Sequence, residues 1–217
     1  MASAKKATPA AKKTTATTKK TASLAASIQS VLPVPKKVVD APKPADWAFI
    51  ESAIGTPLPA DYKEFLQTYG SGTISNYMRV LNPFSTTELW LEKVRFRLSI
   101  YHSSRRNNPV PGFTLPPPLA PVNSMPYPIF PESGGVFPWG HTENGDGLLW
   151  LTQGNPNEWK VVAETRSFRY AEFPGTMTEF LTALLSGKLT WGAFDPGAEK
   201  VPPPNFAADG ASAGKGK

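Results

Sequence analysis

The chain has 217 residues, a formal net charge of +6 at pH 7 and no cysteine, which excludes a disulfide framework and a thiolate metal site. No stretch of about eighteen apolar residues occurs, so a membrane-spanning helix is excluded as well. The residues after the first lysines are alanine, threonine and more lysine, not the apolar core of a secretory signal, so we expect a cytoplasmic protein.

The net charge is distributed unevenly along the chain. Residues 1–43 contain nine lysines and one aspartate, a charge of +8, and residues 200–217 contain three lysines and one aspartate, a charge of +2. Residues 44–199 contain eleven basic and fifteen acidic residues, which gives −4. We therefore expect a mildly acidic folded part between two basic tails.

The N-terminal region, residues 1–45, consists mainly of alanine, lysine, threonine, serine and proline. So few large apolar groups cannot bury enough surface to offset the entropy lost on ordering. The composition predicts a disordered tail that ends in a proline-rich linker, with a transient helix over residues 24–32 where apolar residues recur at helical spacing.

Six lysines of this tail form pairs at a seven-residue spacing: Lys5, Lys6, Lys12, Lys13, Lys19 and Lys20. Two interpretations stay open. The tail is a solvated arm, or it neutralises phosphates and holds the protein non-specifically on nucleic acid. Without interleaved aromatic residues, stacking on bases is not supported.

Two short helices are predicted between residues 46 and 70. Trp47, Ile50 and Ile54 form one apolar stripe, and Gly55 provides a stop because glycine adopts left-handed backbone angles without steric cost. Pro59 favours a second helix start. The apolar face of the second helix, which ends at Gly70, carries Tyr62, Phe65, Leu66 and Tyr69.

The middle of the chain mixes strand and helix patterns. Residues 73–81 read as one strand. Ser85 and Glu88 fit a capping box before a helix whose apolar residues continue to Tyr101. Residues 107–131 contain nine prolines, which exclude a helix and a central strand, so we expect a proline-rich loop there.

The last part of the chain predicts a hairpin and a closing helix. Residues 147–152 and 159–164 are strand-like, and residues 154–157 supply turn signals between them. Thr176 and Glu179 form a second capping box before an apolar helix face that ends near Gly187. Residues 196–217 read as a disordered tail. Helices at both ends with strands between them indicate an α+β fold.

These segments resemble the SUKH superfamily, which includes fungal cell-wall synthesis regulators and many bacterial toxin-immunity proteins. The resemblance covers residues 46–190 and is carried by core and turn residues: Trp47, Glu51, Gly55, Leu58, Pro59, Asp61, Tyr62, Phe65, Leu66, Tyr69, Gly70, Gly72, residues 138–140, 144–147, 149–150, 159–162 and 180–181. It implies a single domain over residues 46–195, with a mostly antiparallel sheet and helices packed at both ends. The proline-rich residues 107–131 depart from the compact family pattern.

A catalytic or metal site is weakly suggested by His141, Glu143 and Asp146, which lie close together in sequence. The favoured interpretation is a solvated turn, because Asn144 and Gly145 suit a chain reversal. The chain contains no phosphate-binding glycine loop and no dinucleotide fingerprint. We expect no enzymatic activity, no metal and no cofactor.

The same turn region supplies a candidate contact surface for a protein partner. Aromatic residues near turns often anchor partners, although packing is their commoner role. The candidate partner-binding residues are Trp139, His141, Glu143, Asp146, Glu158 and Trp159.

The resemblance and the acidic domain together suggest an immunity protein that occludes a toxin, such as a nuclease with a cationic substrate groove. The alternative is an intracellular scaffold or regulator that binds a protein through its SUKH-like domain and nucleic acid through its lysine tail. A hydrolase built on His141 is a third, weaker interpretation.

Overall fold

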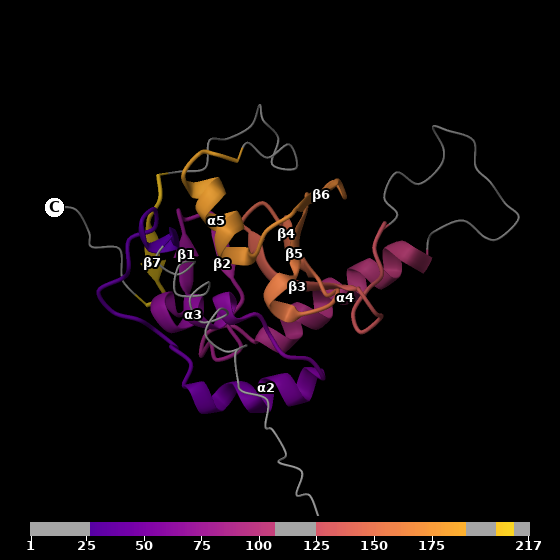
Figure 1. The fold of residues 1–217 in the computed structure, drawn as a ribbon, viewed down its shortest axis with the longest axis horizontal. Helices are drawn as coiled ribbons and strands as arrows, with labels where there is room; N and C mark the ends of the chain where they lie inside the picture. The colour runs from indigo at the N-terminus through magenta and orange to yellow at the C-terminus, as the bar shows by residue number, and fades with distance from the viewer. Residues whose placement is uncertain (1–26, 107–124, 190–202, 211–217) are drawn as a thin grey trace, which may run out of the picture.

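The sheet of the computed structural model has seven strands, all antiparallel, in the order β6-β5-β4-β3-β2-β1-β7. The structure describes residues 27–106, 125–189 and 203–210 (Figure 1). The strands are β1 (Gly72–Ile74), β2 (Met78–Val80), β3 (Val136–Thr142), β4 (Gly147–Leu151), β5 (Lys160–Glu164), β6 (Tyr170–Phe173) and β7 (Phe206–Ala208). The helices are η1 (Pro44–Asp46), α2 (Trp47–Ile54), α3 (Ala60–Tyr69), α4 (Trp90–Arg106), η2 (Pro156–Glu158) and α5 (Met177–Leu185). The predicted α+β class is confirmed.

Successive side chains of a strand point to opposite faces of the sheet, so both faces carry apolar groups that helices can cover. The helices lie on the sheet in two groups. On one face, Tyr62 of α3 packs edge-on against Trp150 of β4 with ring centroids 5.0 Å apart, and Phe180 of α5 packs against Trp139 of β3. On the other face, Tyr101 of α4 joins a smaller buried cluster that includes Leu149, Val162 and Ile129. The larger core therefore lies under α3 and α5 and also includes Trp90 and Val94 from the start of α4, whereas the smaller core surrounds Tyr101 further along α4.

The predicted helix pair is confirmed residue by residue. Gly55 ends α2 with a left-handed φ of 75°, and its N–H donates to the Glu51 carbonyl. Gly70 ends α3 with φ 69°, where an added Cβ would come within 2.0 Å of the Val39 carbonyl oxygen. Gly70 is therefore required both for its backbone angle and for the close approach of residues 38–39.

The closing elements also match their predictions. The strands β4 and β5 pair over their whole length, from Gly147 opposite Glu164 to Leu151 opposite Lys160. The Thr176 N–H donates to Glu179 at 2.8 Å at the start of α5, as a capping box requires.

The predicted single strand over residues 73–81 is wrong, because this segment folds as a tight hairpin. Ser75 and Asn76 both adopt left-handed angles, with φ of 54° and 49°, and reverse the chain between β1 and β2. Short polar side chains tolerate this conformation better than bulky ones. The imperfect alternation of apolar residues in this segment reflects the turn.

The first capping box forms only in part, and α4 starts later than predicted. The Ser85 hydroxyl accepts the Glu88 N–H at 3.1 Å, but the helix begins at Trp90. Since the Glu88 carboxylate points to Lys93 and His141, it does not return to the Ser85 backbone.

Parts of both predicted tails pack against the domain. In residues 27–45, Ile28 and Leu32 are buried, and Tyr69 Oη donates to the Leu32 carbonyl at 2.7 Å. In residues 203–210, Phe206 packs against Tyr69, and β7 (yellow in Figure 1) pairs with β1. Tertiary contacts to α3 order both segments, whereas residues 1–26 and 211–217 lie outside the described residues.

The proline-rich segment is described only from Met125 onward. Met125 and Ile129 are buried in the cluster beneath α4, and Ile129 forms a bridge to Val136. The rest of the predicted loop, residues 107–124, lies outside the described residues. Within residues 27–106, 125–189 and 203–210, no helix is both long enough and apolar enough to cross a membrane.

Candidate functional site

The two tryptophans of the predicted contact surface are buried, which corrects that part of the prediction. Trp139 is 0% exposed and Trp159 is 3% exposed. Trp139 packs against Trp150 and Phe180, and Trp159 packs against Trp150. Their rings stabilise the core and do not present a surface to a partner.

Asp146 is also buried, and its carboxylate holds the turn between β3 and β4. Oδ2 accepts the Thr142 hydroxyl at 2.7 Å, and Oδ1 accepts the Arg166 N–H at 3.0 Å. The Gly145 N–H donates to the Thr142 carbonyl, and Gly145 has φ 88°. The predicted turn is confirmed, and Asp146 serves the fold.

The exposed members of the predicted set do not form one surface. Glu143 lies in the turn at one end of β4, whereas Glu158 belongs to η2, in the connection at the other end of that strand. His141 lies beside Arg79 in the β2–β3 register, half-buried near Glu143. Only His141 and Glu143 remain neighbours on the same side of the molecule.

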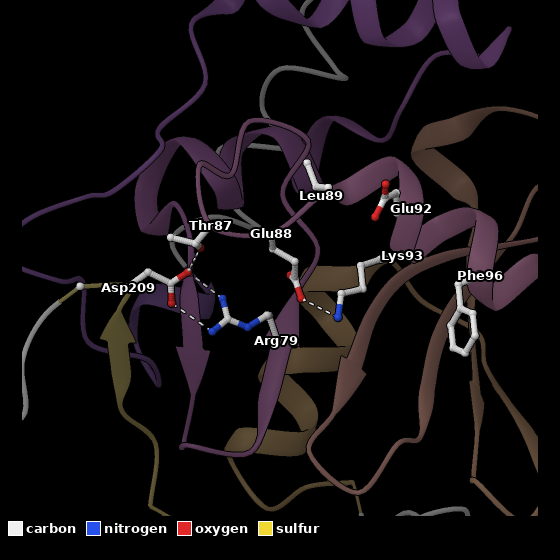
Figure 2. A pocket seen from close by; sticks show the side chains of 9 residues that line it. Arg79, Thr87, Glu88, Leu89, Glu92, Lys93, Phe96 and Asp209 are labelled. Atoms are coloured by element: carbon white, nitrogen blue, oxygen red, sulfur yellow. Dashed lines mark hydrogen bonds and ion pairs between the residues drawn. The ribbon is translucent and has the colours of Figure 1, made fainter.

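An open groove lies between the start of α4 and the strands β2 and β7 (Figure 2), and its residue Glu88 approaches His141. Its volume is about 830 Å³, within the range of about 300–1,000 Å³ that is typical of ligand pockets. We call it the α4 groove. It is lined by Arg79, Thr87, Glu88, Leu89, Glu92, Lys93, Phe96, Asp209 and Gly210.

One wall of the α4 groove is fixed by a two-point ion pair. Arg79 Nη1 and Nη2 donate to the two carboxylate oxygens of Asp209 at 2.8 and 3.0 Å. The Thr87 hydroxyl donates to the same carboxylate at 3.3 Å. Because Arg79 belongs to β2 and Asp209 follows β7, the pair links the C-terminal strand to the sheet. Both terminal nitrogens of the Arg79 guanidinium are engaged in this ion pair.

The opposite wall is organised around Glu88. Its Oε1 lies 3.8 Å from His141 Nε2 and 3.3 Å from Lys93 Nζ. Interaction with His141, then with Lys93, lowers the pKa of Glu88 to about 2 against the opposing effect of burial. The groove therefore carries a permanently ionised carboxylate at neutral pH.

Exposed apolar side chains border the same groove. The exposed large apolar residues of the described structure are Val34, Phe49, Leu89, Leu91 and Phe96. Three of these five lie within eight residues at the start of α4, and Leu89 and Phe96 are 67% and 66% exposed. A concentration of this kind in a monomer marks an interaction surface more often than chance exposure.

A second cluster of titratable groups lies beneath α4 and is closed to solvent. Glu164 is 2% exposed, accepts the Tyr101 hydroxyl at 2.5 Å and lies 3.8 Å from Arg97. Burial raises the pKa of Glu164, although Tyr101 and Arg97 oppose that shift. Arg97 also donates to the Gly145 carbonyl at 3.0 Å, so this cluster anchors α4 to the sheet.

Most of the domain that carries these two clusters matches one known family. A family model described as SUKH_6, SMI1-KNR4 cell-wall, matches residues 44–181. The chain belongs to the SUKH family. No curated protein and no solved structure matches the chain. The resemblance seen in the sequence is thus confirmed as family membership.

The α4 groove of this SUKH protein is built partly from outside the family segment. Arg79 and the start of α4 lie within residues 44–181, but Asp209 and Gly210 do not. Sequence reasoning missed the groove because Arg79 and Asp209 are 130 residues apart and their pairing has no local signature. The apolar residues Leu89 and Phe96 at the start of the predicted helix were a detectable signal, since both are exposed.

Proposed function

We propose that this protein is a non-catalytic binding protein that acts as an immunity protein, capturing a toxin domain and blocking its active surface. Membership of the SUKH family supports a binding role, because the family includes toxin-immunity proteins. The observation that carries the proposal is the α4 groove, where exposed apolar side chains lie beside ionised carboxylates.

The titratable groups of the described structure support binding over catalysis. Asp146 and Glu164 are committed to buried hydrogen bonds, and His141 Nδ1 lies 3.3 Å from the Thr142 carbonyl. In residues 27–106, 125–189 and 203–210, no group of three histidine or acidic side chains could hold a metal ion.

The charge of the domain indicates which toxins fit. Residues 44–199 carry eleven basic and fifteen acidic side chains, a charge of −4. A nuclease presents a cationic groove to its substrate, and an acidic partner is attracted to it by opposite potentials. We therefore propose a nuclease domain as the partner, occluded sterically by this protein.

Co-production with a candidate toxin tests the proposal directly. The C-terminal domain of a large secreted protein encoded by the neighbouring gene is the first candidate. We expect cell survival only when this protein is present, together with a stable complex that weakens as salt concentration rises. Absence of both rescue and complex would contradict an immunity role, and covalent change in the toxin by mass spectrometry would contradict a non-catalytic one.

The alternative, a scaffold tethered to nucleic acid, rests on the six paired lysines, which lie outside the described residues. Because residues 27–45 contact the core, the discriminating truncation removes residues 1–26 alone. Loss of salt-sensitive nucleic-acid binding with toxin capture retained would assign the two activities to separate parts of the chain.

A further inference from the structure

We propose that the α4 groove is the docking surface for a short segment of a protein partner in which a lysine or arginine lies between bulky apolar side chains. This assignment rests on the proposed binding function and adds to it the location and the chemistry of the contact.

The basic residues of the groove are already paired, which leaves its available charge negative. Arg79 gives both terminal nitrogens to Asp209, and Lys93 lies against Glu88 Oε1. Within the described residues, Glu88 Oε2 makes no hydrogen bond or ion pair. The groove can therefore accept a cation without displacing an existing one.

Glu92 provides a second carboxylate for the incoming cation. It lines the groove from the first turn of α4, four residues after Glu88, and is exposed. No hydrogen bond or ion pair to its carboxylate is present in the part of the chain that the structure describes. A lysine or arginine placed between Glu88 and Glu92 would meet two acidic groups.

The apolar residues around these carboxylates indicate which side chains should flank the cation in the partner segment. Leu89, directly before α4, and Phe96, within α4, both line the groove and are exposed. Figure 2 shows the Glu88 and Lys93 side chains meeting beside the start of α4, with the Arg79–Asp209 pair nearby. A segment with apolar groups on both sides of its cation would cover both exposed side chains and surround the new ion pair.

A synthetic peptide tests the assignment even before the partner protein is identified. The probe is a fluorescein-labelled twelve-residue peptide with leucine, lysine and phenylalanine repeats between serine spacers. We expect saturable binding to the full chain by fluorescence anisotropy, and NMR shift changes centred on residues 87–96. A peptide with glutamate in place of lysine should bind at least tenfold more weakly, and equal binding of the two peptides would overturn the charge assignment.

Matched surface variants locate the contact. Phe96→Ser and Glu92→Lys should each weaken peptide binding at least tenfold. Phe49→Ser and Glu158→Lys change exposed residues away from the groove. These two control variants should change peptide affinity less than threefold. All four positions face solvent, so thermal unfolding should show that each variant remains folded. An equal loss in the control variants would overturn the assignment.

Further experiments distinguish a partner segment from the chain's own C-terminus as the occupant of the groove. They also distinguish failure of the docking surface from failure of the immunity role. Removing residues 211–217 should leave peptide affinity within threefold, whereas a tenfold gain would show that Lys215 and Lys217 of the chain itself occupy the groove and would overturn a partner segment. Toxin capture that persists in Phe96→Ser would overturn the docking surface and leave the immunity role intact. Peptide binding without any toxin rescue would contradict the immunity role and leave the docking surface intact.

Discussion

The carboxylate of Asp61, in the first turn of α3, accepts hydrogen bonds from both the N–H and the hydroxyl of Thr178, in the first turn of α5. The two donor–acceptor distances are 2.9 and 3.1 Å, and both side chains are buried. A family-motif aspartate therefore joins the starts of two helices. Its role is to align α3 and α5 on one face of the sheet.

Asp61→Ala should lower the free energy of unfolding by about 2–3 kcal/mol, because it leaves two buried donors of Thr178 without an acceptor. Urea unfolding followed by tryptophan fluorescence measures the change. Gln67→Ala, at an exposed position of the same helix, is the control and should change stability by less than about 0.5 kcal/mol. Equal stability of the two variants would rule out this role for Asp61.

The Arg79–Asp209 pair should contribute measurably to stability, because both hydrogen bonds are charge-assisted and the side chains are only 21% and 14% exposed. A double-mutant cycle with Arg79→Met and Asp209→Ala is expected to give a coupling energy of about 1–2 kcal/mol. The corresponding cycle on the exposed Lys160–Glu172 pair should give less than about 0.5 kcal/mol. Equal values in the two cycles would mean that β7 is not held through this contact.

Glu88 should stabilise the fold in a pH-dependent way. Its pKa falls from an ordinary 4.5 to about 2 in the folded protein, so its contribution is present above about pH 4.5 and is lost as pH falls toward 2. Glu88→Gln should be less stable at pH 7 by about 1 kcal/mol and should lose less stability between pH 5 and pH 3 than the wild type. Parallel curves of unfolding free energy against pH would contradict this pairing with His141 and Lys93.

Glu164 should show the opposite dependence, because burial raises its pKa above the ordinary value. The folded protein then holds an extra proton between the unfolded and folded pKa values, so stability falls as pH rises through that interval. Glu164→Gln removes this titration, and its stability relative to the wild type should improve as pH rises from 4 to 8. Chemical denaturation across this range tests the sign. A constant difference between the two proteins would show that Glu164 does not titrate in this way.

The local elements of this protein could be predicted from sequence because their signals are short-range. Gly55, Gly70 and the Thr176–Glu179 box define helix ends within a few residues of themselves. The errors arose where long-range contacts decide the outcome. The Glu88 carboxylate pairs with Lys93 and with His141, far along the chain, and does not complete the predicted cap.

The candidate site was predicted only in part, for the same reason. His141 contacts Glu88 in the wall of the α4 groove, but composition and spacing could not show that Trp139 and Trp159 would pack against Trp150. An aromatic residue close to a turn signal in the sequence is compatible with either an exposed or a buried position. Burial is decided by the packing of α3 and α5, which no local pattern specifies.

The strand β7 has a consequence for how such domains diversify. A shorter protein ending at Leu189 would retain the whole matched segment, yet β1 would become an outer strand with unpaired backbone groups, a surface that recruits strands from other copies. By pairing with β1 and supplying Asp209, a few C-terminal residues form the outer strand of the sheet and complete one wall of the α4 groove. The binding specificity of the groove can thus change through substitutions in the C-terminal residues while the core of the domain stays unchanged.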